Sequence, residues 1–461
     1  MKHKIKHIHF IGIGGVGMSG IAEVLYNLGY TVTGSDVAGS YNTERLEAQG
    51  ITVFIGHNAD NIKGADVIVA STAVSNSNPE IMAGDEAGIT IVPRAMMLAE
   101  LMRFKYGIAI AGTHGKTTTT SLCAEVLRQC GLDPTFIIGG KLAVTDSNAK
   151  LGAGEYLVAE SDESDASFLY LNPLISVVTN IDLDHMDTYE HDEGKLKQAF
   201  IDFLHRLPCY GRAILCNEDR RVREIIPHVK RPIVTYGLSD NCDIYAKDIV
   251  SDGNKMHFTL YIKNAAIHKH SITLNLPGVH NVLNALAVIA VAIECEGKIS
   301  DIADGLANFH GVDRRCQQYP DVVKDGKSAI LIDDYGHHPA ELKATLCALK
   351  GAYPDKRMVL IFQPHRYTRT RDLFDDFVNV LSNVEVLILL EVYSAGEEPI
   401  ALADGRSLLR AVRLQGNVNT IFAKNLEDAK DVFFNVMQEG DLVVTMGAGS
   451  IGKLPQILLE A

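Results

Sequence analysis

Residues 106–118 read YGIAIAGTHGKTT, an apolar run followed by a loop that is rich in glycine and carries one lysine and three threonines. The apolar run predicts a buried strand, and the pattern that continues to Arg128 predicts a helix directly after the loop. Backbone N–H groups of such a loop bind phosphates, the lysine neutralises β- and γ-oxygens, and the hydroxyl after it binds Mg²⁺. Ile110 stands where the standard motif has its first glycine, so this is a variant phosphate loop. The alternative is a glycine-rich turn with a surface lysine. The candidate nucleotide-binding residues are Gly112, Thr113, His114, Gly115, Lys116, Thr117 and Thr118.

The same alternation of short apolar runs and amphipathic stretches covers most of the 461 residues. It is typical of an α/β protein with largely parallel sheets and crossover helices. We expect three domains, at residues 1–104, 105–311 and 312–461. The third contains apolar runs at 329–332, 358–362, 386–390, 420–422 and 442–445, each followed by a helical pattern. A strand-rich insertion is expected at 242–276.

Composition excludes several classes of protein. Lys and Arg number 43 and Asp and Glu 57, giving a formal charge of −14. A nucleic-acid binder is therefore not expected, since affinity for a phosphate backbone comes from a cationic surface. The longest apolar helix candidate, 282–293, is too short to span a bilayer, so we expect no membrane insertion. None of the 8 cysteines forms a C-x-x-C pair, which favours free thiols and a cytoplasmic location.

A second glycine motif opens the chain. Gly12, Gly14 and Gly17 follow an apolar run, and Asp36 comes 24 residues after the first of them. This pattern predicts a site for a dinucleotide or a nucleotide diphosphate at a helix N-terminus. A nicotinamide-dependent oxidoreductase is one alternative, but it leaves Lys116 unexplained. Residues 447–452 match the same glycine pattern, yet so little chain follows that we interpret them as a structural turn.

Polar clusters follow several other predicted strands. ESDESD at 160–165 and DLDHMD at 182–187 come after two apolar runs of the second domain, and could meet the phosphate loop at one Mg–ATP. Asn281 and Asn284 share one face of a predicted helix start. In the third domain, DDYGHHP at 333–339 and QPHRYTRT at 363–370 suit an anionic substrate. The alternatives are solvated loops for the two acidic clusters, helix capping for one Asn, and ordinary loop ion pairs in the third domain. A second Asn inside an apolar helix indicates a ligand contact. A non-catalytic nucleotide switch would leave the third-domain clusters without a role.

Taken together, these motifs resemble the Mur ligase family over essentially the whole chain. The resemblance rests, in order, on GIGGVGMSGIAE, GTHGKTTTT, AESDESDASFL, NIDLDHMDTY, GVHNVLNA, GVDRR, DDYGHHP and FQPHRYTRT. The first and last stretches are similar to the member that adds L-alanine, and not to the recycling member that attaches a ready-made tripeptide. The resemblance implies a Rossmann-like UDP-binding domain, a P-loop ATPase domain and a C-terminal domain with a dinucleotide-fold topology.

The resemblance also implies an activity. The chain would join L-alanine to the lactyl carboxylate of UDP-N-acetylmuramate through an acyl phosphate, releasing ADP and phosphate, in peptidoglycan precursor biosynthesis. ATP and Mg²⁺ would be required, and an equilibrium between monomer and dimer is left open. Sister ligases carry a carbamylated lysine in a Y-x-x-A-K stretch; residues 197–200 read KQAF here, so we expect no such modification.

The family roles map onto individual residues. The residues implied for the UDP-sugar are Gly14, Gly15, Val16, Gly17, Met18, Asp36, His57 and Ser71. Besides the phosphate loop, Asn284 and Arg315 would contact ATP, and Thr117, Glu160 and His185 would hold Mg²⁺. The substrate residues at the reacting end would be Tyr335, His337 and His365. The catalytic residues would be Lys116, His338, Arg366 and Arg369.

Overall fold

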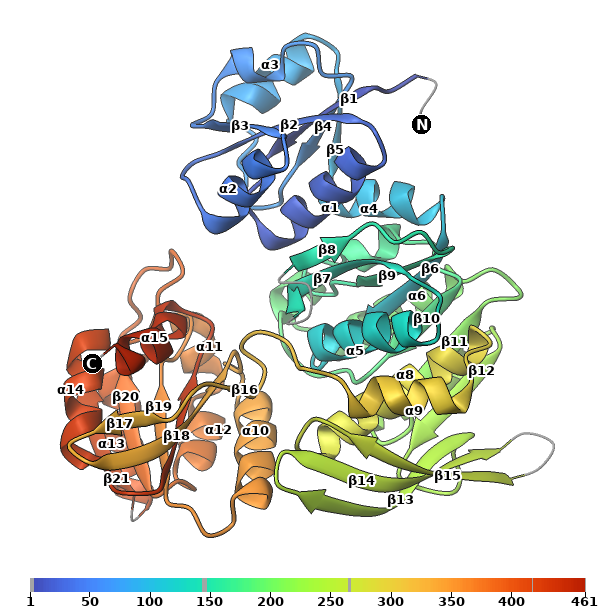
Figure 1. Ribbon diagram of the computed structural model, residues 1–461. Coiled ribbons are helices and arrows are strands. Elements are labelled where there is room, and N and C mark those ends of the chain that lie inside the picture. Colours follow the sequence, from blue (N-terminus) through green and yellow to red (C-terminus); the bar gives the residue numbers. More distant parts are fainter. Residues whose placement is uncertain (1–3, 143–146, 264–266, 417, 461) are drawn as a thin grey trace. The chain divides into compact units, whose positions relative to one another are not determined.

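The computed structural model describes residues 4–142, 147–263, 267–416 and 418–460. These residues form three sheets, which are separate in sequence and mostly parallel (Figure 1). The α/β class with three sheet-based domains is confirmed.

The first sheet is entirely parallel, in the order β3-β2-β1-β4-β5. Its strands are β1 His7–Ile11, β2 Thr31–Asp36, β3 Thr52–Ile55, β4 Val67–Ala70 and β5 Thr90–Pro93. The helices are α1 Val16–Asn27, α2 Tyr41–Ala48, α3 Pro79–Glu86 and α4 Arg94–Met102, with a 3₁₀ turn η1 Ala59–Ile62. Because the strands are parallel, the ends of β1, β2 and β4 lie at one edge of the sheet, where ligands collect in this type of fold.

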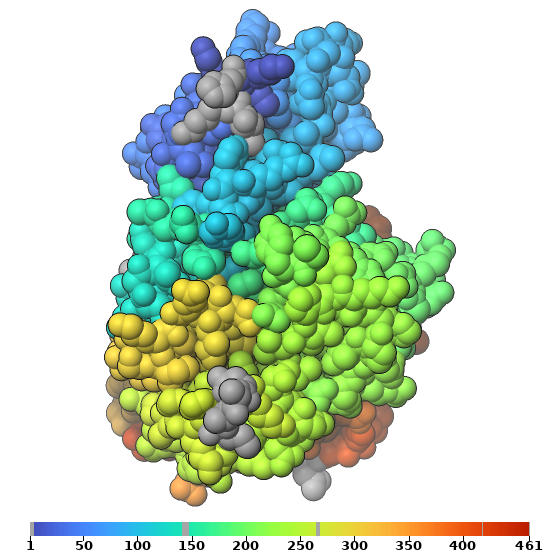
Figure 2. All heavy atoms as spheres, turned by 90° about the vertical axis from the view of Figure 1, so that its right-hand side faces the viewer, coloured from blue at the N-terminus to red at the C-terminus, as the bar shows by residue number. Residues whose placement is uncertain are grey.

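The second sheet has the order β15-β14-β13-β12-β11-β10-β6-β9-β7-β8. Its strands are β6 Tyr106–Ala111, β7 Thr135–Leu142, β8 Ser147–Lys150, β9 Tyr156–Glu160, β10 Ile175–Val178, β11 Arg212–Cys216, β12 Ile233–Gly237, β13 Ile244–Asp252, β14 Lys255–Lys263 and β15 Ile267–Leu274. The helices are α5 Lys116–Gln129, α6 Glu193–His205, α7 Arg220–Ile225, α8 Val279–Glu294 and α9 Ile299–Ala307, with 3₁₀ turns η2 Ser167–Tyr170, η3 Met186–Tyr189 and η4 Ile226–His228. The strand-rich insertion predicted at 242–276 is confirmed as β13–β15. Figure 2 shows the surface of α9 (gold) beside that of the inserted strands (lime green), in agreement with the packing of α9 on β15.

The third sheet has the order β16-β18-β22-β19-β20-β21, with β17 paired to β18. Its strands are β16 Gln317–Gln318, β17 Val322–Lys324, β18 Lys327–Asp334, β19 Met358–Phe362, β20 Val386–Leu390, β21 Asn419–Ala423 and β22 Asp441–Met446. The helices are α10 Pro339–Ala352, α11 Tyr367–Asp372, α12 Phe374–Leu381, α13 Gly405–Gln415, α14 Leu426–Val436 and α15 Leu454–Leu459, with a 3₁₀ turn η5 Ser450–Lys453. The five predicted apolar runs are therefore confirmed as β18–β22. Their alternate side chains fill two cores, one on each face of the sheet.

The glycine pattern at 447–452 is a turn between β22 and α15, as predicted. Gly447 has φ +141°, and a Cβ on Gly449 would lie 2.7 Å from the ring of Tyr393. Both positions therefore require glycine for packing and backbone geometry.

Contacts between residues divide the chain into two compact units. The first comprises the chain up to residue 248 together with 258–274 and 282–310, and so contains the first sheet and most of the second. The other comprises 249–257, 275–281 and the chain from 311 onward. Among the described residues, no helix has the length and apolar character needed to cross a membrane.

Candidate active site

The glycine-rich loop after β1 is held in one conformation by its neighbours. Gly12 has φ +81°, and its N–H donates to the carbonyl oxygen of Ser35 at 2.8 Å. The N–H of Gly14 donates to Asp36 Oδ2 at 2.8 Å, and that oxygen would lie only 2.9 Å from a Cβ on Gly14. Asp36 therefore contacts the loop itself, and a side chain at position 14 would displace it.

The other residues predicted for the UDP-sugar lie around this loop. Val16 begins α1 with an exposed side chain, whereas Met18 is only 2% exposed. Met18 can therefore contact a ligand through its backbone alone, because its side chain belongs to the core. Ser71 follows β4, and its Cβ would lie 3.2 Å from a Cβ on Gly12. The ends of β1, β2 and β4 thus meet at the loop.

His57 is positioned by a buried carboxylate that sequence reasoning did not identify. Glu80, in the first turn of α3, is completely buried. Its Oε2 accepts a hydrogen bond from the hydroxyl of Ser35 at 2.5 Å, and this hydroxyl also lies 3.0 Å from Nδ1 of His57. Oε1 accepts from the side chain of Asn61 at 2.6 Å. Burial by itself raises the pKa of Glu80, but hydrogen bonds from His9, Ser35, Asn61 and Asn58 outweigh it and lower the pKa to about 2.

This pKa predicts a contribution of Glu80 to stability that depends on pH. A carboxyl whose pKa is lower in the folded state stabilises the fold fully above its unfolded pKa, and loses this contribution as the pH falls toward the folded value. A drop from 4.5 to about 2 corresponds to about 3 kcal/mol. We expect Glu80→Gln to lower the unfolding free energy at pH 7 and to flatten its decline between pH 4.5 and 2. Denaturant titrations at several pH values measure this, with the exposed Glu44→Gln as control; parallel pH profiles for wild type and Glu80→Gln would contradict it.

The phosphate loop joins β6 to α5, as the sequence predicts. Gly112 has φ +129° and Gly115 has φ +82°, a left-handed conformation that favours glycine. A Cβ on Gly112 would lie 2.1 Å from Thr179 Oγ1, and one on Gly115 would lie 2.9 Å from Asn284 Oδ1. Asn284, in α8, is thus brought against the loop from more than 160 residues away in sequence.

Lys116 begins α5 and is paired with a buried carboxylate. Its Nζ lies 2.8 and 3.0 Å from the two carboxylate oxygens of Glu163 and donates to the carbonyl oxygen of Gly112 at 2.7 Å. Burial opposes the charge on this lysine, but nearby Glu163 and Asp162 outweigh that effect and raise the pKa of Lys116. The ammonium therefore stays protonated at neutral pH, as the neutralisation of phosphate charge requires.

The candidate metal ligands lie at the end of β9, in the segment after β10 and at the start of α5. In the sheet order, β6 lies between β10 and β9, so the ends of all three strands share one edge. Glu160 ends β9 and accepts a hydrogen bond from the N–H of Gly139 at 2.8 Å. His185 follows β10, with φ +54° and its Nε2 3.5 Å from Asp184 Oδ2. Thr117 lies in the first turn of α5.

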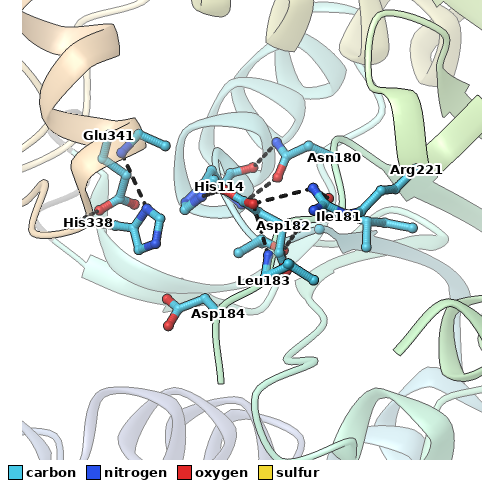
Figure 3. Close-up of polar contacts among 12 residues, drawn as sticks. His114, Asn180, Ile181, Asp182, Leu183, Asp184, Arg221, His338 and Glu341 are labelled. Carbon is cyan, nitrogen blue, oxygen red and sulfur yellow. Dashed lines mark hydrogen bonds and ion pairs between the residues drawn. The ribbon is translucent and has the colours of Figure 1, made fainter. Parts of the chain in front are cut away.

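His114 belongs to a polar cluster at the same edge, shown in Figure 3. Its N–H donates to Asn180 Oδ1 at 2.8 Å, and its Nε2 lies 3.2 Å from Asp182 Oδ2. Arg221, from α7, approaches the other oxygen of Asp182 at 3.5 Å. Asp182 belongs to the cluster 182–187 that its place after a strand marked, whereas nothing in the sequence places Arg221 beside it.

In the other unit, aromatic rings and arginines gather where β18, β19 and β20 end. The ring of His337 lies 5.4 Å from that of Tyr335 and 5.6 Å from that of His365. His365 stacks on Tyr393 at 5.6 Å. Arg315 lies over the Tyr335 ring at 5.2 Å. Sequence reasoning missed Tyr393, although it follows the end of β20.

The two histidine rings are neutral at physiological pH. Burial lowers the pKa of His337 to about 4. Burial and the neighbouring His337, Arg369 and Arg366 lower the pKa of His365 to about 4. These rings can donate and accept hydrogen bonds but carry no charge, so positive charge at this place comes from the arginines.

His338, Arg366 and Arg369 differ in their burial and in their hydrogen-bond partners. His338 is buried at the N-cap of α10, where Nδ1 accepts from the N–H of Ala340 at 3.3 Å and its own N–H donates to Glu341 (Figure 3). Arg366 precedes α11 with φ +70° and an exposed side chain, and its N–H donates to the carbonyl oxygen of Tyr393 at 2.8 Å. Arg369, inside α11, is only 9% exposed.

Three family models match successive parts of the chain. They are described as "Mur ligase family, catalytic domain" for residues 7–106, "Mur ligase middle domain" for 110–292, and "Mur ligase, glutamate ligase domain" for 314–449. Each matched range contains one of the three groups of candidate residues.

Similar proteins match over nearly the full length. The UDP-N-acetylmuramate–L-alanine ligase of Chromobacterium violaceum is 60% identical over 456 residues, which is 99% of this chain and 98% of the relative. The same-named protein of Neisseria gonorrhoeae is 58% identical and covers 100% of this chain and 99% of its own. The crystal structure of UDP-N-acetylmuramate-alanine ligase from Thermotoga maritima aligns with a TM-score of 0.83 at 28% identity, covering 99% of this chain and 98% of that one.

Proposed function

This chain belongs to the Mur ligase family, and on that premise we propose that it is an ATP-dependent ligase joining L-alanine to the lactyl carboxylate of UDP-N-acetylmuramate. The observation that carries the proposal is the 60% identity, over nearly the whole of both chains, to a ligase of that name. The phosphate loop with its charged lysine supplies independent chemical support. The reaction belongs to peptidoglycan precursor synthesis.

We propose three domains with different tasks. Residues 1–104 would bind the UDP-sugar, 105–311 would bind ATP, and 312–461 would bind the amino acid. Each range holds one of the three sheets and one cluster of candidate residues. All eight cysteines lie in the described part of the chain and are free, which is consistent with the cytoplasmic location that we propose.

The glycine-rich loop after β1 is the proposed site for the UDP diphosphate. Gly14, Gly15, Val16, Gly17 and Met18 present their backbone to it at the N-terminus of α1, where partial positive charge favours an anion. Asp36, His57 and Ser71 complete the set for the nucleoside and sugar. In the second domain, Lys116 and the backbone of residues 112–118 would bind ATP phosphates, with Asn284 beside them and Arg315 contributing from the third domain.

The donor groups beside the phosphate loop fit Mg²⁺, which prefers oxygen ligands. Glu160 ends β9, the strand next to β6, and the hydroxyl of Thr117 lies in the first turn of α5, directly after Lys116. His185 is the less typical third ligand for this ion. When bound there, Mg²⁺ would neutralise charge on the phosphate oxygens of ATP.

We expect Glu160→Ala to raise the Mg²⁺ concentration that half-saturates the enzyme, because one hard ligand is removed. Adding Mg²⁺ should restore most of the activity. Titrations of ADP release against Mg²⁺ at saturating ATP test this, with Asp202→Ala on the exposed face of α6 as control. If the Mg²⁺ titration of Glu160→Ala were unchanged, Glu160 would not be a ligand, and Asp162 or Glu163 would take its place in the assignment.

The reaction needs activation because a carboxylate is a poor electrophile. An oxygen of the lactyl carboxylate attacks the γ-phosphorus of ATP, ADP leaves, and an acyl phosphate forms. The uncharged amine of L-alanine then attacks the acyl carbon, phosphate leaves, and the nitrogen loses a proton. Lys116, Arg366 and Arg369 act on the negative charge that gathers in these steps, and Tyr335, His337, His338 and His365 shape the place where the amino acid binds.

The decisive experiment measures ADP release with UDP-N-acetylmuramate and a panel of amino acids. We expect release to require the sugar nucleotide and to be supported by L-alanine. ADP formed at the same rate without either substrate would overturn the proposed function.

A further inference from the structure

The glycine-rich loop of the first sheet is tied to the edge of the second sheet. The side-chain nitrogen Nδ2 of Asn148, on β8, donates to the carbonyl oxygen of Val16 at 2.6 Å. Val16 is the first residue of α1, so this carbonyl belongs to the turn whose N–H groups face the proposed diphosphate site. Asn148 is only 2% exposed, so its side chain is held inside the structure although Val16 itself is exposed.

Arg45, from α2, fixes the orientation of the Asn148 amide. Its Nη2 donates to Asn148 Oδ1 at 2.7 Å. Its Nη1 donates to Ser147 Oγ at 2.7 Å and to Glu23 Oε2 at 2.8 Å. Arginine has no acceptor, so the amide oxygen must face it and the amide NH₂ must face Val16. The contacts from Glu23 through Arg45 to Asn148 thus allow only one orientation of the Asn148 amide.

Close packing reinforces this connection. A Cβ on Gly20 of α1 would lie 3.0 Å from Cβ of Ala149 and 3.4 Å from Ile137, on β8 and β7. Figure 1 shows the β7–β8 pair next to α1. Such contact leaves little freedom for the helix to slide along the strands.

The same pair of strands also reaches the proposed metal site. The N–H of Gly139 on β7 donates to Glu160, and a Cβ at position 139 would lie 2.6 Å from Glu160 Oε2. β7 and β8 pair antiparallel, so they form one element that touches the diphosphate loop through Asn148 and the candidate metal ligand through Gly139.

We propose that Asn148 and Arg45 are positioning residues, which set where the glycine-rich loop, and hence the lactyl carboxylate, lies relative to the γ-phosphate of ATP. The inference rests on the proposed function. Both side chains are largely buried and act through the loop rather than on substrate in this proposal. A misplacement of about 1 Å between reacting groups can lower a rate by on the order of 10²-fold.

Variants at Asn148 test this best, because Arg45→Ala would also leave buried Glu23 without its partner and destabilise the fold. Asn148→Ala removes both contacts. Asn148→Asp keeps an acceptor for Arg45 but loses the donor to Val16. We expect both to lower kcat by about 10- to 100-fold with KM for ATP little changed. Gln49→Ala is the control, since the Gln49 side chain donates to Glu23 and its removal leaves the bonds of Asn148 to Arg45 and Val16 in place, and it should retain wild-type kcat.

The readouts are kcat, the KM values of all three substrates and the unfolding midpoint. If Asn148 had a structural role alone, its variants would lower the unfolding midpoint and leave kcat per folded enzyme unchanged. That result would overturn the proposal. Near-normal kcat with an unchanged midpoint in both Asn148 variants would overturn it as well. Normal activity in Asn148→Asp with loss in Asn148→Ala would also overturn the role of the Val16 bond. If ADP release by the wild-type enzyme did not depend on L-alanine, the proposed function would be contradicted instead. The ratio of ADP release by the variant to that by the wild type would still measure the positioning effect.

Discussion

Replacing Lys116 by alanine is expected to lower turnover by about 10³-fold while leaving the affinity for UDP-N-acetylmuramate nearly unchanged. The ammonium is held at the start of α5 by Gly112 and Glu163, where it faces the phosphates that the loop would bind. Its charge is needed most when the γ-phosphoryl group moves, so its loss affects the transition state more than binding. The proposed UDP-sugar site lies in another domain and keeps its contacts.

This variant also has a cost in stability that can be separated from catalysis. The Glu163 side chain is 3% exposed, and without Lys116 its carboxylate is buried and unpaired. Removing one partner of such a pair typically costs about 3–5 kcal/mol. The double variant Lys116→Ala/Glu163→Gln removes the unpaired charge, so we expect it to recover much of the lost stability but none of the lost turnover.

Two measurements check the prediction. Single-turnover ADP formation gives the rate, and calorimetric titration with UDP-N-acetylmuramate gives the affinity. Loss of sugar binding in a folded Lys116→Ala enzyme would count against the proposed division into domains. Recovery of turnover in the double variant would show that Lys116 acts only by balancing Glu163.

The parts of the fold that the sequence predicted are those with strong local signals. The run 106–111 is apolar and is followed by a glycine-rich loop and a helical pattern, so both the strand and the phosphate loop follow from adjacent residues. The five apolar runs of the third domain are equally local, and all are strands. Asn284 was singled out because a second Asn inside an apolar helix is unusual, and it lies against Gly115.

The missed residues depend on contacts between distant parts of the chain. Glu80 stands in Asn78-Pro79-Glu80, which signals an ordinary helix start, and nothing local shows that it is completely buried beside Ser35 and His57. Glu163 is one of four carboxylates in six residues, and only the fold distinguishes it as the partner of Lys116. Such pairs require the register of several strands, which periodicity alone does not give.

Arg366 and Arg369 stand three residues apart, a spacing that predicts side chains on one side of a helical turn, but the structure shows a less symmetrical arrangement. Arg366 lies just before α11 and is exposed, whereas Arg369 lies within the helix and is buried. Both lower the pKa of His365, so both place positive charge near that ring. The backbone of Arg366, at φ +70°, is held in a conformation that non-glycine residues rarely adopt, and such strain is found preferentially at functional sites.

We therefore expect Arg366→Ala and Arg369→Ala each to lower kcat by about 10²–10³-fold, or about 2.7–4 kcal/mol of barrier, with the KM for ATP little changed. A guanidinium fixed in this position stabilises the charge of the acyl phosphate and of the tetrahedral adduct more than that of the substrates. Arg→Lys keeps the charge but loses the forked geometry, so it should recover only part of the activity. The KM for L-alanine should rise for at least one of the two.

The two positions separate catalysis from folding. Exposed Arg366 can be removed with little effect on packing, whereas the loss of buried Arg369 also affects stability, so Arg369→Lys is the cleaner variant there. Arg371, exposed on the same helix and paired with Asp372, is the matched control, and Arg371→Ala should behave like wild type. Steady-state kinetics of ADP release with each substrate varied in turn measure all of these effects. Near-normal kcat and L-alanine KM in Arg366→Ala and Arg369→Lys alike would reduce both arginines to structural contacts, because the first variant removes a charge and the second removes the forked geometry, and each loss should change the rate if the arginines act on the reacting carboxylate.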